Sequence, residues 1–363
     1  MAHRNVESLI GRLVTDPKLR RRFARDSSAL LGELRDGGLE LTTVEIEALA
    51  STDPDALRRL AEALDRRIRK APQEEPMSDH PFAQSELTMP DGRTVGFADY
   101  GTPDQTAVLW CHGGPGSRLE PEHFAAEAAR AGLRLVGIDR PGYGRSTAWP
   151  GRTLGGGVPD ALAVADRLGI DRFAVVGVST GGAHALALAS RTDRVLGAVA
   201  CCAVTDMRWP PGRASMQICH PLWEAPDREA ALAVAVELFG EDGARVAAMP
   251  PEGDLAETDL ALFDDPAWCR YWLGCVPEMF THGVAGYADD RLADGRGWHD
   301  FDVAAITCPV VVLHGGSDTL APVVNAHHTA AVVPGATLNV FDRLGHFSII
   351  FEVVPTVRRL LDG

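Results

Sequence analysis

The chain has 363 residues, of which 45% are hydrophobic and 23% are charged, a composition typical of a folded protein with one large domain and a smaller one. The formal net charge of -15 argues against partners that require clustered Lys and Arg, namely nucleic acids and anionic membranes. The seven cysteines have no disulfide-scaffold spacing, and neither a signal cleavage site nor a run of about 18 apolar residues is present. We therefore expect a reduced, cytoplasmic protein.

Residues 1–71 have the apolar spacing of amphipathic helices. One stripe is formed by Leu9, Ile10, Leu13 and Val14, and the pattern repeats after Thr52 and Asp53, which are candidate helix caps. Residues 72–82 contain three prolines and three acidic side chains. This composition predicts a small helical domain followed by an extended linker.

From residue 83 onward, short β-type runs alternate with helical stretches. The first two runs form a predicted hairpin with Asp91 and Gly92 in its turn. Further strands are predicted at 107–111, 133–138, 173–178, 195–201, 310–315 and 337–341. Such alternation favours an α/β fold with a mostly parallel sheet covered by helices.

The strand signal disappears between residues 204 and 300. This segment holds five of the seven tryptophans in a helical and loop-rich background. We interpret it as a helical cap inserted between the two parts of the core, 83–203 and 301–363. The alternative is a helical extension of the core without a pocket beneath it.

The stretch VVGVSTGGAHALALAS, residues 175–190, places Ser179 between Gly177 and Gly181 where a strand pattern becomes a helix pattern. This strand-turn-helix context is the setting of a nucleophile elbow, in which glycine-sized neighbours allow strand and helix to approach closely. Ser179 is therefore the candidate nucleophile, exposed at the carboxyl edge of the sheet.

A serine nucleophile needs a base and a group that orients the base. Asp318 and His346 each follow one of the last two predicted strands, so a parallel sheet would bring both to the edge that carries Ser179. Asp206, after the preceding strand, and Asp342, close to His346 in sequence, are alternative acids. The predicted triad is Ser179, His346 and Asp318.

The glycine-rich stretch CHGGPGS, residues 111–117, follows the first long strand. We assign the backbone amides of Gly114 and Thr180 as donors to the oxyanion of a tetrahedral intermediate. A tight turn without a ligand is the alternative. The stretch lacks the ending of a phosphate-binding loop and the chain lacks zinc-ligand spacing, so we expect neither a cofactor nor a metal.

Taken together, HGGPGS, IDRPGYGRS, GVSTGG, HGGSD and GHF resemble motifs of the α/β-hydrolase superfamily, in the same order along residues 83–361. The resemblance implies an eight-stranded, mostly parallel sheet, a cap after the sixth strand and the triad given above. HGGPG is similar to the prolyl aminopeptidase branch, but that branch has tryptophan after its nucleophile, where this chain has Thr180.

Residues 1–71 resemble the small helical subunit of protocatechuate 4,5-dioxygenase, whose chemistry belongs to its other subunit. The similarity lies in LVTDPKLRRRFARDSSALLGEL and LTTVEIEALASTDPDALRRLA. We therefore interpret these residues as a packing or contact module for a second copy or another partner, without catalytic residues.

The favoured hypothesis is a serine hydrolase that cleaves an ester, thioester or lactone of an apolar or aromatic small molecule. Candidate substrate-binding residues in the cap are Trp209, Trp223 and Trp272. Three alternatives stay open: a lyase, cyclase or cofactor-free oxygenase that uses the triad for proton transfer, an aminopeptidase of the prolyl type, and a non-enzymatic binding protein.

Overall fold

A computed structural model describes residues 82–247 and 255–363 and, nearer the N-terminus, residues 6, 9, 22–25, 27–36 and 42–50. The chain divides into two compact units, Met1–Met77 and Ser78–Gly363. In the first unit, the described helices are α3 (Ser27–Asp36) and α4 (Thr43–Ala50). They share a buried apolar cluster of Leu9, Phe23, Leu30, Leu31 and Leu49. The predicted linker lies outside the described residues, apart from Phe82.

The second unit is built on an eight-stranded sheet with the order β1-β2-β4-β3-β5-β6-β7-β8. The strands are β1 (Phe82–Thr88), β2 (Thr94–Tyr100), β3 (Thr106–Cys111), β4 (Leu133–Ile138), β5 (Phe173–Val178), β6 (Val195–Cys201), β7 (Val310–Gly315) and β8 (Thr337–Phe341). The pairs β1–β2 and β2–β4 are antiparallel and the others are parallel. The predicted fold class is confirmed, and among the six strands given bounds only β3 differs, beginning one residue earlier.

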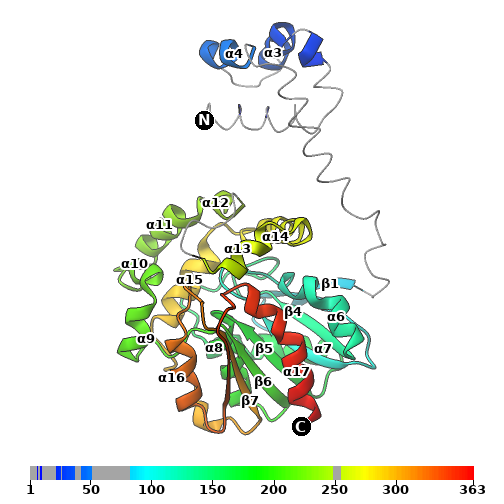
Figure 1. The fold of residues 1–363 in the computed structure, drawn as a ribbon, viewed down its shortest axis with the longest axis vertical. Coiled ribbons are helices and arrows are strands. Elements are labelled where there is room, and N and C mark those ends of the chain that lie inside the picture. Colours follow the sequence, from blue (N-terminus) through cyan, green and yellow to red (C-terminus); the bar gives the residue numbers. More distant parts are fainter. Residues whose placement is uncertain are drawn as a thin grey trace. The chain divides into compact units, whose positions relative to one another are not determined.

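Helices cover both faces of this sheet because its central strands are apolar on both sides. All residues of β4, β5 and β7 are buried. One face packs against α6 (Ala125–Arg130) and α17 (Val353–Asp362), and the other against α7 (Val158–Arg167) and α8 (Gly181–Arg191). Successive side chains of β3 alternate between the two cores, with Val108 in one and Leu109 in the other. Figure 1 shows these layers around the central strands.

Helices without intervening strands make up the described part of residues 204–300. They are α9 (Pro210–Ser215), α10 (His220–Trp223), α11 (Arg228–Phe239), α12 (Ala244–Ala247), α13 (Glu257–Phe263), α14 (Pro266–Met279) and α15 (Ala285–Asp294). Figure 1 shows α11 to α14 along the top of this unit and α9 and α10 to the left of the strands. We call this group of helices the cap.

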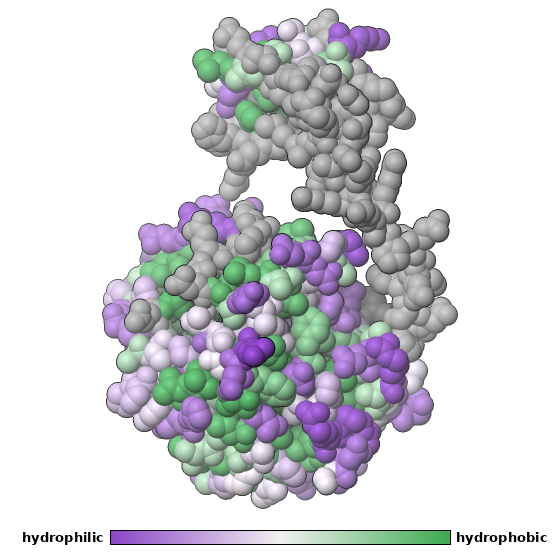
Figure 2. Space-filling model, viewed as in Figure 1, coloured by the Kyte–Doolittle hydropathy of each residue, from purple (hydrophilic) through white to green (hydrophobic). Residues whose placement is uncertain are grey.

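The remaining helical elements lie between the strands, within the cap or after the last strand. They are the α-helix α16 (Val324–Val332) and the 3-10 helices Glu120–Phe124, Gly155–Gly157, Gln217–Cys219, Val303–Ala305 and Ser348–Glu352. On the viewed face of the second unit, hydrophobic and hydrophilic side chains are intermingled (Figure 2). No helix in the described ranges is long and apolar enough to span a membrane.

Candidate active site

Ser179 occupies a sharp turn between β5 and α8. Its φ of 54° lies in the left-handed region, which non-glycine residues rarely adopt. A Cβ on Gly177 would lie 2.2 Å from the carbonyl oxygen of Gly181, and one on Gly181 would lie 2.0 Å from that of Cys111. The glycines at these positions therefore let α8 pack directly onto β5 and β3. The serine is held at the strained tip, partly exposed, as a nucleophile elbow requires.

The side chains of Asp318 and His346 meet at the carboxyl ends of β7 and β8. His346 Nδ1 donates to Asp318 Oδ2 over 2.8 Å. The other carboxylate oxygen accepts hydrogen bonds from the amides of Leu320 and Ala321, at 2.9 and 2.8 Å. The carboxylate is fixed by its own loop and directed at the imidazole. Ser179 follows β5, two strands away from β7 in the sheet, at the same edge.

The two alternative acids are engaged elsewhere. The Asp206 carboxylate pairs with Arg208, at 2.6 Å, and accepts from the Trp298 amide. Asp342 is exposed. Of the three aspartates that the sequence left open, Asp318 is therefore the one that the structure brings to His346.

His346 is buried, and burial by itself lowers the pKa of its imidazole. The neighbouring Asp318 carboxylate outweighs this effect and raises the pKa well above the usual value near 6.5. The Cys202 side chain also lies beside the imidazole, but burial raises the pKa of its thiol well above 9, which keeps the thiol neutral. We therefore assign the raised pKa of His346 to Asp318.

Cys202, Asp318 and His346 place potential metal-ligand atoms within 4.8 Å of one another, and no second cluster of this kind occurs among the described residues. The Nδ1 atom of His346 already donates to Asp318 in this cluster. In this cluster the nitrogen of His346 that faces Asp318 is therefore already occupied by a hydrogen bond. Like Ser179, Cys202 has a positive φ, 42°, directly after its strand.

The two residues assigned as oxyanion donors, Gly114 and Thr180, lie close together in space. A Cβ on Gly114 would lie 2.8 Å from Thr180 Oγ1, so the glycine lets the loop after β3 approach the elbow. The backbone amide of the preceding residue, Gly113, already has an acceptor within the protein, because it donates to Glu120 Oε2 over 2.8 Å. Burial raises the pKa of Glu120 to about 6, although hydrogen bonds from Trp110 and Gly113 oppose the shift.

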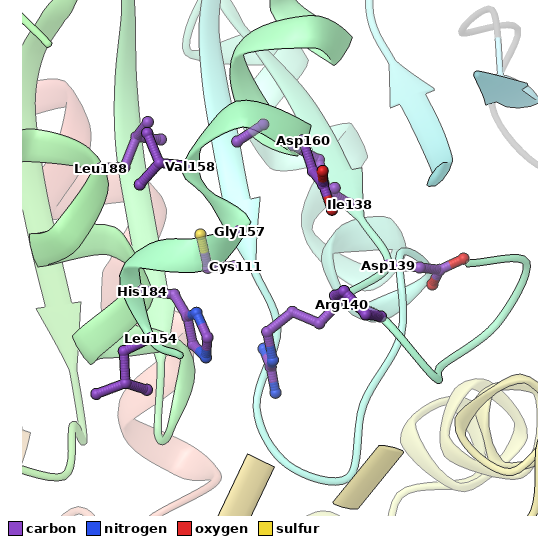
Figure 3. A pocket seen from close by; sticks show the side chains of 12 residues that line it. Cys111, Ile138, Asp139, Arg140, Leu154, Gly157, Val158, Asp160, His184 and Leu188 are labelled. Carbon is purple, nitrogen blue, oxygen red and sulfur yellow. The ribbon is translucent and has the colours of Figure 1, made fainter. Parts of the chain in front are cut away.

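Arg140, from the loop after β4, holds the carbonyl side of the same loop. It donates to the carbonyl oxygens of His112 and Gly113 and to the carboxylate of Asp290 on α15. Figure 3 shows Arg140 and His184 lining one small cavity of about 40 Å³ beside α8. Arg140 therefore holds two carbonyl groups of the loop that carries Gly114.

Asp259, on cap helix α13, binds the backbone of the loop that carries His346. Its carboxylate accepts from the amides of His346, Phe347 and Ser348 at 2.7, 3.1 and 2.8 Å, and from the Ser348 hydroxyl at 2.7 Å. The side chain is 1% exposed. The cap thereby fixes the position of the candidate base.

The three cap tryptophans have different surroundings. Trp272 packs edge-on against Phe347, the residue after His346, with ring centroids 5.4 Å apart. Trp223 donates to Asp294 of α15 over 2.7 Å. Trp209 stacks on His328 of α16 in an open groove, with ring centroids 4.0 Å apart. The structure thus packs Trp272 against the sequence neighbour of His346 and directs the contacts of Trp209 elsewhere.

Glu120, Arg140 and Asp259 are not predicted from the sequence as part of this region. For Arg140 a signal exists, because it lies inside the IDRPGYGRS motif. Glu120 lies only seven positions after Gly113 but belongs to no motif, and Asp259 reaches the site through a contact with His346, 87 positions away.

Known proteins share this architecture. The chain is 26% identical over 278 residues to a non-heme haloperoxidase of Rhodococcus erythropolis, covering 72% of this chain and 92% of the relative. It is also 26% identical over 313 residues to a proline iminopeptidase of Xanthomonas citri, covering 78% and 96%. An enol-lactonase structure from Burkholderia xenovorans LB400 superposes with a TM-score of 0.57 at 18% identity, covering 77% of this chain and 100% of that one.

Residues 106–353 match the model of a family described as the alpha/beta hydrolase fold. The match includes the elbow, the cap and the loops of Asp318 and His346. It does not extend to residues 1–71, so the resemblance of this segment to a dioxygenase subunit gains no support. With more than half of its length matched and with the strand order and elbow described above, the chain belongs to the α/β-hydrolase superfamily.

Proposed function

We propose that this protein is a serine hydrolase that cleaves an ester, thioester or lactone of a small molecule through an acyl-enzyme on Ser179. The observation that carries the proposal is the hydrogen bond between His346 and Asp318 at the sheet edge where Ser179 occupies its strained turn. Because Nδ1 donates to Asp318, the neutral imidazole has its lone pair on Nε2. That nitrogen can accept the hydroxyl proton of Ser179.

The reaction then has two halves. Ser179 Oγ attacks the substrate carbonyl as its proton passes to His346, and the amides of Gly114 and Thr180 stabilise the oxyanion. The carbon–oxygen or carbon–sulfur bond breaks, and the imidazolium protonates the leaving group. Water then attacks the acyl-enzyme as it loses a proton to His346. The bond between the acyl carbon and Ser179 Oγ breaks, the imidazolium returns the proton to Oγ, and the acid and the free serine are released.

Two features support an ester-type substrate with an apolar body. Trp272 and Phe347 offer aromatic surface next to His346. The charged side chains closest to Gly114 are the guanidinium groups of Arg140 and Arg291. Cations at this position disfavour the free ammonium group that an aminopeptidase must bind.

The proposal is tested by treating the full-length protein with a fluorophosphonate probe and locating the adduct by mass spectrometry. We expect one adduct on Ser179, none in Ser179→Ala, and a loss of roughly 10⁶-fold in the turnover of 4-nitrophenyl esters in that variant. A folded protein that forms no adduct and hydrolyses no ester would contradict the proposal. Hydrolysis in H₂¹⁸O separates it from a proton-transfer enzyme, because only hydrolysis puts ¹⁸O into the acid product.

A further inference from the structure

Glu120 is the first residue of the 3-10 helix Glu120–Phe124, and its carboxylate binds the loop after β3. Oε2 accepts a hydrogen bond from the Gly113 amide over 2.8 Å, and Oε1 accepts one from the Trp110 indole over 2.8 Å. Both donors are neutral, and burial raises the pKa of the carboxyl group to about 6. Burying a carboxylate costs free energy, so a side chain that only filled this space would be better apolar. The two hydrogen bonds therefore point to a task for Glu120.

The Glu120 carboxylate lies beside the candidate nucleophile. A Cβ on Gly113 would lie 3.3 Å from Glu120 Oε2 and 3.6 Å from the Cβ of Ser179. Burial, which raises the pKa of Glu120, outweighs the nearby charge of His346, which lowers it. Glu120 is thus a second carboxylate near the reacting groups, besides Asp318. Because a negative charge here repels a developing oxyanion, any benefit to the reaction must come from the hydrogen bonds of Glu120.

The peptide groups on the two sides of Gly113 are almost fully bound. Glu120 accepts from the Gly113 amide, and Arg140 donates to the Gly113 carbonyl oxygen over 2.9 Å. The His112 ring donates to the same oxygen from Nδ1 over 2.6 Å, because its Nε2 accepts from the Arg140 amide. The Gly114 amide has no acceptor among the residues that the structure describes. In a trans peptide the N–H points away from the preceding C=O, so the contacts that hold the Gly113 carbonyl also aim the Gly114 amide.

The cap holds the main chain of Glu120. The Tyr271 hydroxyl of α14 donates to the Glu120 carbonyl oxygen over 2.7 Å. The Glu120 amide donates to the Ser117 carbonyl oxygen over 3.1 Å. The main chain is therefore fixed by the cap and by its own turn, while the side chain holds Gly113. An anchored acceptor of this kind keeps the loop in one position during the reaction.

We propose that Glu120 is a positioning residue for the proposed hydrolysis. By holding the Gly113 amide, it keeps the neighbouring Gly114 amide directed at the oxyanion. This inference rests on the proposed function. The hydrogen bond acts through geometry, because a donor stabilises an oxyanion best when it is already in place. Loss of the acceptor leaves the Gly113 amide buried and unpaired, so the loop shifts and the Gly114 donor moves with it.

The first test replaces Glu120 by a side chain of similar length that is only a weak acceptor. Glu120→Met should lower kcat for 4-nitrophenyl butyrate by about 10- to 100-fold and leave KM within about threefold of the wild type. Glu122→Met is the matched control, because Glu122 lies in the same helix and is also half-buried. It should stay within about twofold of the wild type in both constants. Unchanged kcat in Glu120→Met, a loss confined to KM, or an equal loss in both variants overturns the inference.

The second test separates the hydrogen bond from the charge. When Glu120→Gln is combined with Trp110→Phe, the indole donor is absent, so the amide oxygen can face Gly113 and the NH₂ group can face away. This double variant has the hydrogen bond without the negative charge. Its kcat should lie within about threefold of that of Trp110→Phe alone, whereas Glu120→Met in the same background should lose about tenfold or more. Equal losses for the two substitutions overturn the inference.

The third test measures stabilisation of the oxyanion itself. With an alkyl trifluoromethyl ketone, Ser179 Oγ adds to the carbonyl carbon, the serine proton passes to His346, and the ketone oxygen becomes an oxyanion. The methyl ketone of the same chain length serves as the inhibitor without this adduct. Glu120→Met should weaken inhibition by the first ketone about 10- to 100-fold and by the second less than about threefold. Similar weakening of both overturns the inference, because the substitution would then have changed the whole pocket.

Two further measurements separate other causes of failure. If Glu120→Met does not fold, Glu120→Asp takes its place, because its shorter side chain draws the carboxylate away from Gly113. A lower kcat with unchanged KM supports the inference, and wild-type kcat overturns it. If the wild-type protein hydrolyses no ester and Ser179 is not labelled, the proposed function fails. Hydrogen–deuterium exchange of residues 111–117 then tests the hold on the loop separately: faster exchange in the Glu120 variant supports it, and equal exchange overturns it.

Discussion

At the scale of single residues, the chemistry depends on the contact between Asp318 and His346. The carboxylate is held by two backbone amides and faces Nδ1 at 2.8 Å. This contact selects the tautomer that leaves Nε2 as the proton acceptor, and it stabilises the imidazolium formed when Ser179 attacks. The same contact raises the pKa of His346.

The raised pKa predicts the pH dependence of the reaction. The base must be neutral to accept a proton, so kcat/KM should fall as the pH drops through the raised pKa of His346, with an apparent value above 6.5. Asp318→Asn should move this acidic limb of the pH profile, where kcat/KM falls, to lower pH. It should also reduce kcat by about 10⁴-fold. Steady-state kinetics from pH 5 to 9 check both effects. If the acidic limb stays at the same pH in Asp318→Asn, the group that titrates there is not a His346 whose pKa depends on Asp318.

At the scale of secondary-structure elements, the cap and the catalytic loops are joined by specific polar contacts. Asp259 of α13 binds three consecutive amides of the His346 loop. The fit is tight, because a Cβ on Gly345 would lie 2.2 Å from the Asp259 carboxylate. The cap therefore contacts the loop of the candidate base directly, and we infer that Asp259 is a positioning residue.

Asp259→Asn should lower kcat by about 10- to 100-fold, because an amide cannot accept from all of these donors and the loop shifts. KM should change little. The rate of fluorophosphonate labelling should fall in parallel, which a loss of substrate contacts alone would not cause. Asp264→Asn, at an exposed position at the end of the same helix, is the control and should stay within about twofold of the wild type. Equal kinetics in both variants would refute the positioning role.

At the scale of the whole molecule, the core and the cap share a buried network of charges. Asp290 of α15 accepts from Arg140, from the Tyr143 hydroxyl and from Arg152. Next to this network, His184 is buried in α8. Burial first, and the Arg140 charge second, lower the pKa of its imidazole to about 3. The folded protein therefore keeps His184 neutral where the unfolded chain protonates it.

This difference predicts that stability falls in mild acid. Between about pH 6.5 and 3 the unfolded state binds a proton that the folded state does not, so the free energy of unfolding increases with pH in this window. His184 contributes up to about 1.4 kcal/mol per pH unit to the slope of the free energy of unfolding. Urea denaturation at several pH values measures the slope, which His184→Gln should reduce. The same slope in wild type and variant would contradict a neutral, buried His184.

Much of this protein can be predicted from local sequence. The strands between 107 and 341 were predicted almost to the residue, because a parallel strand buried on both faces must be an uninterrupted apolar run. The elbow at Ser179 is equally local, since Gly177 and Gly181 are required by the same turn that exposes the serine. Motif order along the chain then indicates a serine, an acid and a base.

Tertiary structure decided what depends on contacts between distant segments. The sequence favours Asp318 as the acid and keeps Asp206 and Asp342 as alternatives, and the folded protein shows that Asp318 is the one that reaches His346. The sequence gives no reason to separate the three cap tryptophans, whereas packing places Trp272 against Phe347 and Trp209 against His328. Asp259 follows no local pattern, because the cap helices are oriented by buried ion pairs and side-chain packing across the fold. The chain itself thus determines the elbow and the strands, and long-range packing determines which side chains surround them.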